Sequence, residues 1–97
     1  MLDLEPRHLA TVKNILGAHV VQARVWAFGS RATGHAQRFS DLDLAIEADA
    51  ELTLGVVGSL REAFSESDLP IMVDVLDLHA VSPEFRHIIE QERILIA

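Results

Sequence analysis

Two short motifs, each at one end of an apolar run, constrain the fold of this chain more than any other feature. The first run ends in Gly29 and Ser30, and after ten further residues Asp41 and Asp43 open the second run. Residues i and i+2 of a strand point to the same face, so the two aspartates would lie side by side. Carboxylates that close repel each other unless a cation lies between them. Mg²⁺ suits such a site, because it is bound by one or two carboxylates together with substrate phosphates.

Gly29 and Ser30 are expected to form the phosphate-binding half of this site. Glycine carries no side chain, so the backbone can approach a phosphate group closely at residue 29. A helix that begins after the turn would point its first N–H groups at the same oxygens. The spacing therefore predicts a metal–triphosphate site between the turn and the two aspartates. The alternative interpretation is a strand that ends in a glycine turn, followed by an acidic strand edge without a ligand.

The pattern resembles the signature of the nucleotidyltransferase superfamily related to DNA polymerase β, which is Gly-Ser, ten residues, and Asp-x-Asp. Residues 31–40 are the ten, so the spacing fits without a gap. The resemblance covers nearly the whole chain and is to the minimal nucleotidyltransferases, the antitoxin half of HEPN–MNT toxin–antitoxin modules. One departure is Thr33, at a position where the family frequently has a basic residue. The threonine removes a possible phosphate contact.

A third carboxylate is expected from the resemblance, on a strand next to the Asp-x-Asp pair. Residues 71–76 are apolar apart from Asp74, and a buried acid is costly unless it is paired or binds a metal. Asp77 points to the opposite face by strand parity, and we expect it to be exposed or to act as a cap. We therefore assign the third carboxylate to Asp74.

The resemblance implies an enzyme that transfers AMP from ATP to a tyrosine hydroxyl of a partner protein, a HEPN ribonuclease toxin that is silenced by the transfer. It also implies two Mg²⁺ ions bound between the carboxylates and the triphosphate. The catalytic and metal-binding residues that it implies are Asp41, Asp43 and Asp74. The nucleotide-binding residues that it implies are Gly29, Ser30, Arg31 and Ser40.

Two other classes of function compete with this expectation. A nucleotide-binding module would neutralise its partner by covering it, without transfer, but occlusion alone would not need three carboxylates. A small-molecule enzyme of the aminoglycoside type is disfavoured, because such enzymes resemble this domain plus an additional C-terminal domain that forms the acceptor pocket. We expect a hetero-oligomer of the chain with its toxin.

Length and composition fit one domain, residues 1–97, with a single core, since 49% of the residues are hydrophobic. No cysteine is present, which excludes disulfides and thiolate metal sites. The first residues lack the basic-then-apolar order of a signal peptide, and no apolar run approaches the ~20 residues of a membrane span. We therefore expect a cytoplasmic protein.

The net charge of −7 is unevenly distributed along the chain. Residues 1–40 carry a net +3, including Arg31 and Arg38 as candidates for phosphate contacts, whereas residues 41–97 carry a net −10. A basic loop beside an acidic half suits a metal–triphosphate ligand, although such an asymmetry also arises by chance in small acidic proteins. A protein that binds duplex nucleic acid needs a broad basic face, so nucleic acid is not expected as a partner.

Hydrophobic periodicity and end signals predict four helices alternating with four strands. The expected helices are residues 6–18, 31–38 (with Gly34 breaking or capping it), 52–67 and 83–91, and the expected strands are residues 25–28, 42–48, 71–76 and 93–96. In the last helix, Phe85, Ile88 and Ile89 are expected to be buried. The order predicts an α/β (α+β) fold in which helices pack against a mixed sheet, as in the polymerase β-like nucleotidyltransferases.

Overall fold

The strands form one mixed sheet in the order β3-β2-β1-β4. A computed structural model describes all residues, 1–97, and its strands are β1 (Arg24–Phe28), β2 (Leu42–Glu47), β3 (Val73–Asp77) and β4 (Ile94–Leu95). β1 pairs antiparallel with β2 and with β4, whereas β2 and β3 run parallel. The predicted mixed sheet is confirmed, and β3 is one of its edges.

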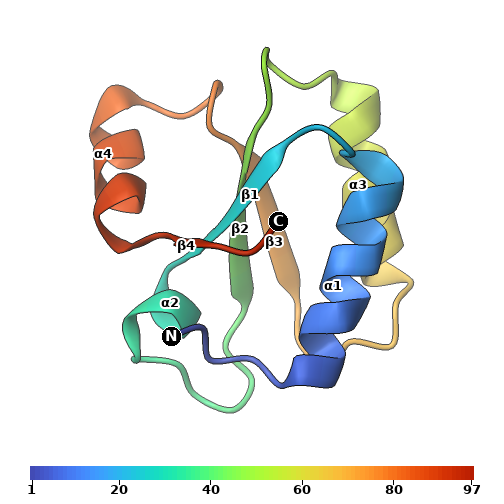
Figure 1. Cartoon of the computed structure of the whole chain (residues 1–97), viewed down its shortest axis with the longest axis vertical. Coiled ribbons are helices and arrows are strands. Elements are labelled where there is room, and N and C mark those ends of the chain that lie inside the picture. The colour runs from blue at the N-terminus through green and yellow to red at the C-terminus, as the bar shows by residue number, and fades with distance from the viewer.

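Helices cover both faces of this sheet. They are α1 (Pro6–His19), α2 (Ser30–Thr33), α3 (Leu54–Ser65) and α4 (Pro83–Glu92). Figure 1 shows α1 and α3 on one side of the sheet and α4 on the opposite side, with the short α2 beyond the end of β1. Val25 and Ala27 of β1 belong to the large core with α1 and α3, whereas Phe28 belongs to a smaller core with α4. Both faces of β1 are therefore buried, as its sequence predicts.

The helix starts follow the local sequence. Pro6 and Pro83 stand at the first positions of α1 and α4, where a missing N–H costs no hydrogen bond. The side chain of Ser82 caps α4 by accepting the N–H of Phe85, and Thr53 caps α3 by accepting the N–H of Val56.

Two expectations about the helices are wrong. The helix predicted over residues 31–38 ends early, as the four-residue α2, because Gly34 adopts a left-handed conformation with φ of 82°; the predicted cap at Gly34 itself is confirmed. α4 buries Ile89, but Phe85 and Ile88 are 38% and 53% exposed. The smaller core has only four buried residues, and Ile89 is the one that α4 contributes, so Phe85 and Ile88 stay partly accessible.

None of the helices combines the length and the apolar character needed to cross a membrane.

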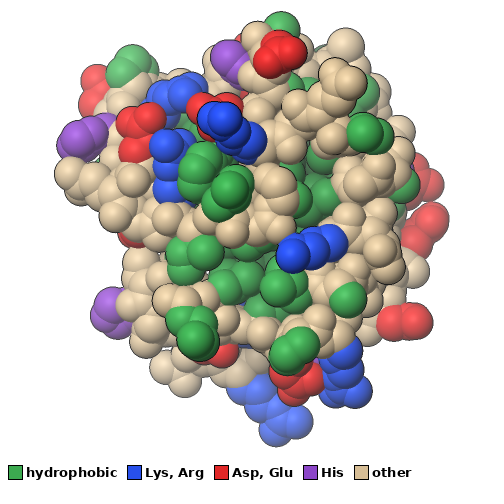
Figure 2. Space-filling view, in the orientation of Figure 1, with side chains coloured by type: hydrophobic (Ala, Val, Ile, Leu, Met, Phe, Trp, Pro, Cys, Tyr) green, Lys and Arg blue, Asp and Glu red, His purple; other side chains and the backbone are tan.

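Charged side chains are spread over the surface. On the face drawn in Figure 2, Lys and Arg side chains lie in small groups among acidic and hydrophobic ones. This face therefore lacks the broad basic patch that is typical of proteins that bind duplex nucleic acid.

Candidate functional site

Three aspartates lie at one end of the sheet, where the C-terminal end of β1 is next to the N-terminal ends of β2 and β3. Asp43 on β2 is the register partner of Phe28 on β1 and of Asp74 on β3. In-register residues of neighbouring strands project from the same face, with the strands about 4.8 Å apart. Asp41 lies two residues before Asp43 and so shares its face. Asp41 and Asp74 are exposed, and Asp43 is half-buried between them.

The charge of this group is unbalanced. Burial raises the pKa of the Asp43 carboxyl above its usual range, and the neighbouring charge of Asp74 raises it further. Asp41 and Glu92 add to the same effect. The carboxylates thus lack a neutralising cation within the protein, and their oxygens are the donors that a hard divalent ion prefers. No three acidic or histidine side chains enclose an ion by themselves, so the remaining ligands of such an ion would come from substrate phosphates and water.

Gly29 brings the backbone directly against Asp43. Its φ of 75° and ψ of −156° lie in a region that is essentially restricted to glycine. A Cβ atom at this position would also collide with Oδ2 of Asp43. Any other residue would therefore strain the turn and displace the carboxylate. This contact joins the two sequence motifs in space.

The turn after Gly29 is closed by its own hydrogen bonds. The Gly29 carbonyl accepts the N–H of Ala32 at 3.0 Å and that of Thr33 at 3.1 Å. The Thr33 hydroxyl donates to the same carbonyl at 3.0 Å, so the threonine that departs from the family pattern stabilises the turn. Ser30, the first residue of α2, is partly buried next to Gly29. Four residues give α2 little dipole, so any anion contact here depends on individual groups.

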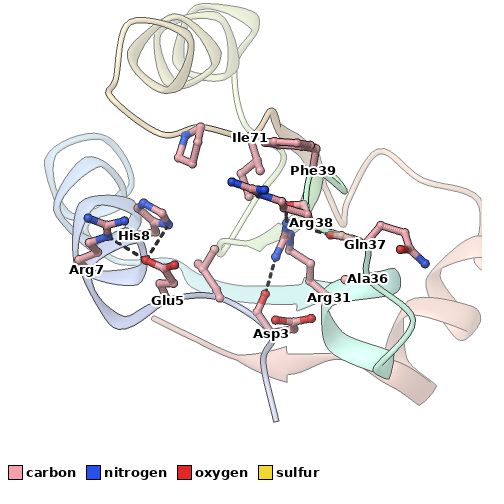
Figure 3. A pocket seen from close by; sticks show the side chains of 12 residues that line it. Asp3, Glu5, Arg7, His8, Arg31, Ala36, Gln37, Arg38, Phe39 and Ile71 are labelled. Atoms are coloured by element: carbon pink, nitrogen blue, oxygen red, sulfur yellow. Dashed lines mark hydrogen bonds and ion pairs between the residues drawn. The ribbon is translucent and has the colours of Figure 1, made fainter.

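The side chain of Arg31, a predicted nucleotide contact, is bound to the protein's own backbone. Its side chain is buried, with an exposure of 6%, and its guanidinium donates to four backbone carbonyl groups. They are Ser40 (2.9 Å), Asp3 (2.8 Å), Gln37 (3.4 Å) and Arg38 (3.1 Å). Figure 3 shows Arg31 reaching to Asp3 in a cleft of about 410 Å³ that none of the three aspartates of the site lines. Arg31 therefore fixes the loop that leads to Asp41.

Ser40 and Arg38 belong to the same loop. The Ser40 hydroxyl accepts the backbone N–H of Gln37 at 2.8 Å, and this bond turns the chain just before Asp41. Arg38 is exposed, and its guanidinium lies over the ring of Phe39 at 5.2 Å. Arg38 lines the cleft of Figure 3, to which none of the three aspartates of the site contributes, whereas Ser40 lies directly before Asp41 in the chain.

Asp74 and Asp77 take different roles on β3. Asp77 is buried, and its carboxylate accepts the backbone N–H groups of Leu52 at 2.6 Å and His79 at 2.9 Å. The expected exposure of Asp77 is wrong, and its carboxylate stabilises loop and turn backbone rather than capping a helix, since the N-caps of α3 and α4 are Thr53 and Ser82. Asp74 is exposed because β3 is an edge strand, so the burial cost expected from its apolar neighbours does not arise. Its position beside Asp43 is what makes it a candidate.

Glu92 is a residue of this site that sequence analysis missed. It is the last residue of α4, and its Oε1 accepts the backbone N–H of Gly29 at 2.8 Å, across 63 positions of sequence. One local feature makes it unusual. The last turn of α4 contains no basic residue, although the helix dipole disfavours negative charge there. That feature alone gives no indication of which strand end the helix approaches.

Comparison with known proteins identifies the family of this chain. The family "Polymerase beta, Nucleotidyltransferase" matches residues 10–97. A relative from Haemophilus influenzae, named "Probable protein adenylyltransferase MntA", is 48% identical over 95 residues, which are 98% of this chain and 83% of the relative.

Solved structures show the same fold. A toxin–antitoxin with AMP-PNP has a TM-score of 0.78 at 22% identity and covers 92% of this chain and 72% of its own. The toxin–antitoxin MntA-HepT has a TM-score of 0.65 at 16% identity and covers 96% and 72%. A structure assigned to the minimal nucleotidyltransferases has a TM-score of 0.69 at 30% identity and covers 91% and 88%. The chain belongs to the polymerase β nucleotidyltransferase family, among the minimal nucleotidyltransferases.

Proposed function

We propose that this chain is a protein adenylyltransferase that moves AMP from ATP to a tyrosine hydroxyl of a partner HEPN ribonuclease toxin and so acts as its antitoxin. The observation that carries the proposal is the contact between the Gly29 backbone and Asp43, with Asp74 in register beside it. The Gly29 turn, which would bind phosphate, therefore lies directly beside the carboxylate group. The name of the 48% identical relative and the toxin–antitoxin structures support the same reaction class.

The carboxylates fit a pair of Mg²⁺ ions. Burial and then the charges of Asp74 and Asp41 raise the pKa of Asp43, so divalent cations would relieve a repulsion that the fold leaves in place. Asp41 and Asp43 would hold both ions, and Asp74 would complete the second site. When bound, the ions supply charge neutralisation for the triphosphate and for the departing pyrophosphate.

The chain's own groups orient the reaction. The turn at Gly29 and the Ser30 hydroxyl hold the β- and γ-phosphates, so that the α-phosphorus faces the acceptor. The tyrosine oxygen forms a bond to the α-phosphorus, and the bond from that phosphorus to the bridging oxygen of pyrophosphate breaks. Asp74 is exposed at the sheet edge, where its carboxylate can accept the proton that the tyrosine hydroxyl loses.

The acceptor is supplied by the partner. This chain contains no tyrosine, and the hydroxyls of serine and threonine are poorer nucleophiles than a phenol with a pKa near 10. A protein tyrosine in the proposed reaction must therefore come from another chain. The name MntA-HepT for a structural neighbour supports a toxin as that chain.

Nucleotide binding tests the site before any partner is added. Calorimetry should show that the wild type binds ATP more tightly with Mg²⁺ than with EDTA. Asp43→Asn keeps the shape of the side chain but should remove that difference, whereas Glu66→Gln, an exposed charge at the end of α3, should preserve it. Equal affinities with and without the metal in the wild type would refute the proposed site.

A further inference from the structure

Glu92 connects α4 to the turn on which the proposed function depends. Its carboxylate accepts the Gly29 N–H at 2.8 Å, while the other side of the same glycine lies against the Asp43 carboxylate. Gly29 is thus flanked by two acids that come from different elements. Glu92 is half-buried, so solvent screens its charge only in part.

No ion pair neutralises Glu92. The adjacent Arg93 stacks on the Trp26 ring, with its guanidinium carbon 3.9 Å from the ring centre. Arg86 of α4 pairs instead with Glu47 at 3.2 Å and with Glu90 at 3.6 Å. The Gly29 N–H is therefore the one hydrogen-bond donor that the fold offers to this carboxylate.

The position of Glu92 is unfavourable for stability in two ways. An acid at a helix C-terminus opposes the helix dipole, and the Glu92 carboxylate adds to the repulsion that Asp43 already experiences from the other aspartates. A glutamine at residue 92 would keep an oxygen that accepts the Gly29 N–H and would carry no charge. The charge itself thus does not stabilise the fold. Its effect falls instead on the charge of a ligand bound beside Gly29.

We infer that Glu92 is a positioning and specificity residue of the nucleotide site. Its oxygen holds the Gly29 backbone in the conformation that the turn requires, and its charge disfavours a triphosphate that is not complexed with a divalent cation. This inference rests on the proposed function, because it assumes that a triphosphate binds at Gly29. It deepens that function by making the metal complex, rather than free ATP, the form that the site accepts.

The two parts of this role separate in two variants. Glu92→Gln removes the charge and keeps the acceptor oxygen, whereas Glu92→Ala removes both. Glu84→Gln is the matched control, since it removes an exposed charge from the first turn of the same helix, at the end far from Gly29. All three proteins are tested as full chains, with ATP as the probe, in EDTA and in Mg²⁺.

Calorimetry should show that Glu92→Gln binds ATP in EDTA about 3- to 10-fold more tightly than the wild type, the range for one charge several ångströms from a triphosphate in a partly screened site. Its affinity in Mg²⁺ should change by less than about twofold, because the complexed triphosphate is largely neutralised. Glu84→Gln should match the wild type in both buffers. An unchanged EDTA affinity in Glu92→Gln would overturn the specificity role.

Hydrogen exchange of the Gly29 amide tests the positioning role without any ligand. Exchange should be slow in the wild type and in Glu92→Gln, and faster in Glu92→Ala, which lacks the acceptor. Equal exchange in Glu92→Ala and the wild type would overturn this role. A wild type that binds no ATP even with Mg²⁺ would instead refute the proposed function itself, and the specificity role with it.

Discussion

Replacing Gly29 with alanine should destabilise the fold more than any other glycine substitution in the chain. A non-glycine residue at φ of 75° and ψ of −156° costs about 1–3 kcal/mol in backbone strain. The added methyl group would also collide with Oδ2 of Asp43, and pushing that side chain off its rotamer costs about 0.5–1.5 kcal/mol. Gly29→Ala should therefore lower the free energy of unfolding by about 1.5–4.5 kcal/mol.

Two other glycines serve as controls for this value. Gly34 also has a positive φ, of 82°, but a Cβ there meets nothing within 4 Å. Gly34→Ala should thus cost only the left-handed strain, about 1–2 kcal/mol. Gly17 lies inside α1 with open space around it, so Gly17→Ala should stabilise the protein by about 0.5–1 kcal/mol.

A double-mutant cycle isolates the contact with Asp43. Urea denaturation measures the free energy of unfolding of Gly29→Ala, Asp43→Ala and the double variant. Removal of the carboxylate should make Gly29→Ala less costly by about 0.5–1.5 kcal/mol, because the collision disappears while the backbone strain stays. A coupling energy of zero, or a Gly29→Ala cost no larger than that of Gly34→Ala, would refute the claim that this glycine holds the turn against the carboxylate.

Two further predictions concern charges around the site. Asp43→Asn should raise the stability of the ligand-free protein at pH 7, because the raised pKa means that the Asp43 charge is less favourable in the folded chain than in the unfolded one. The gain in stability should develop as the pH rises above about 3.9 and vanish at lower pH, where Asp43 is protonated in both the folded and the unfolded state. Urea titrations from pH 3 to 8 measure this gain. A variant that is less stable than the wild type at pH 7 would contradict the prediction. Arg31→Lys should lower the free energy of unfolding by about 2–3 kcal/mol, because one ammonium cannot serve four carbonyl groups that are spread over the loop and the N-terminal segment. A loss below about 0.5 kcal/mol in the same assay would show that those bonds contribute little.

Much of the fold is predictable from local sequence. Proline and cap residues mark the helix starts, and the continuous apolar run from Val25 to Phe28 correctly predicts a strand that is buried on both faces. The exposure of Asp74 is not predictable in this way. The apolar sequence around Asp74 is typical of a central strand, and only the strand order β3-β2-β1-β4 shows that β3 is an edge strand.

The site shows the same limit. The spacing predicts that the Gly29 turn and Asp43 lie near one another, but the direct approach of the backbone to the carboxylate depends on the register that pairs Phe28 with Asp43. The role of Arg31 depends on where the N-terminal segment lies, since one of its acceptors is the Asp3 carbonyl. The contact of Glu92 with Gly29 depends on how α4 packs against the sheet, and no local sequence pattern predicts that contact.

The most direct test of the proposed function is the mass of the partner after reaction. The chain is incubated with its toxin partner, ATP and Mg²⁺, and both proteins are examined by intact-mass spectrometry and peptide mapping. The account predicts AMP on a tyrosine of the partner, no adduct with EDTA or with Asp43→Asn, and almost no modification of this chain, which has no tyrosine. A fully neutralised toxin without any adduct would contradict the account and leave neutralisation by binding alone.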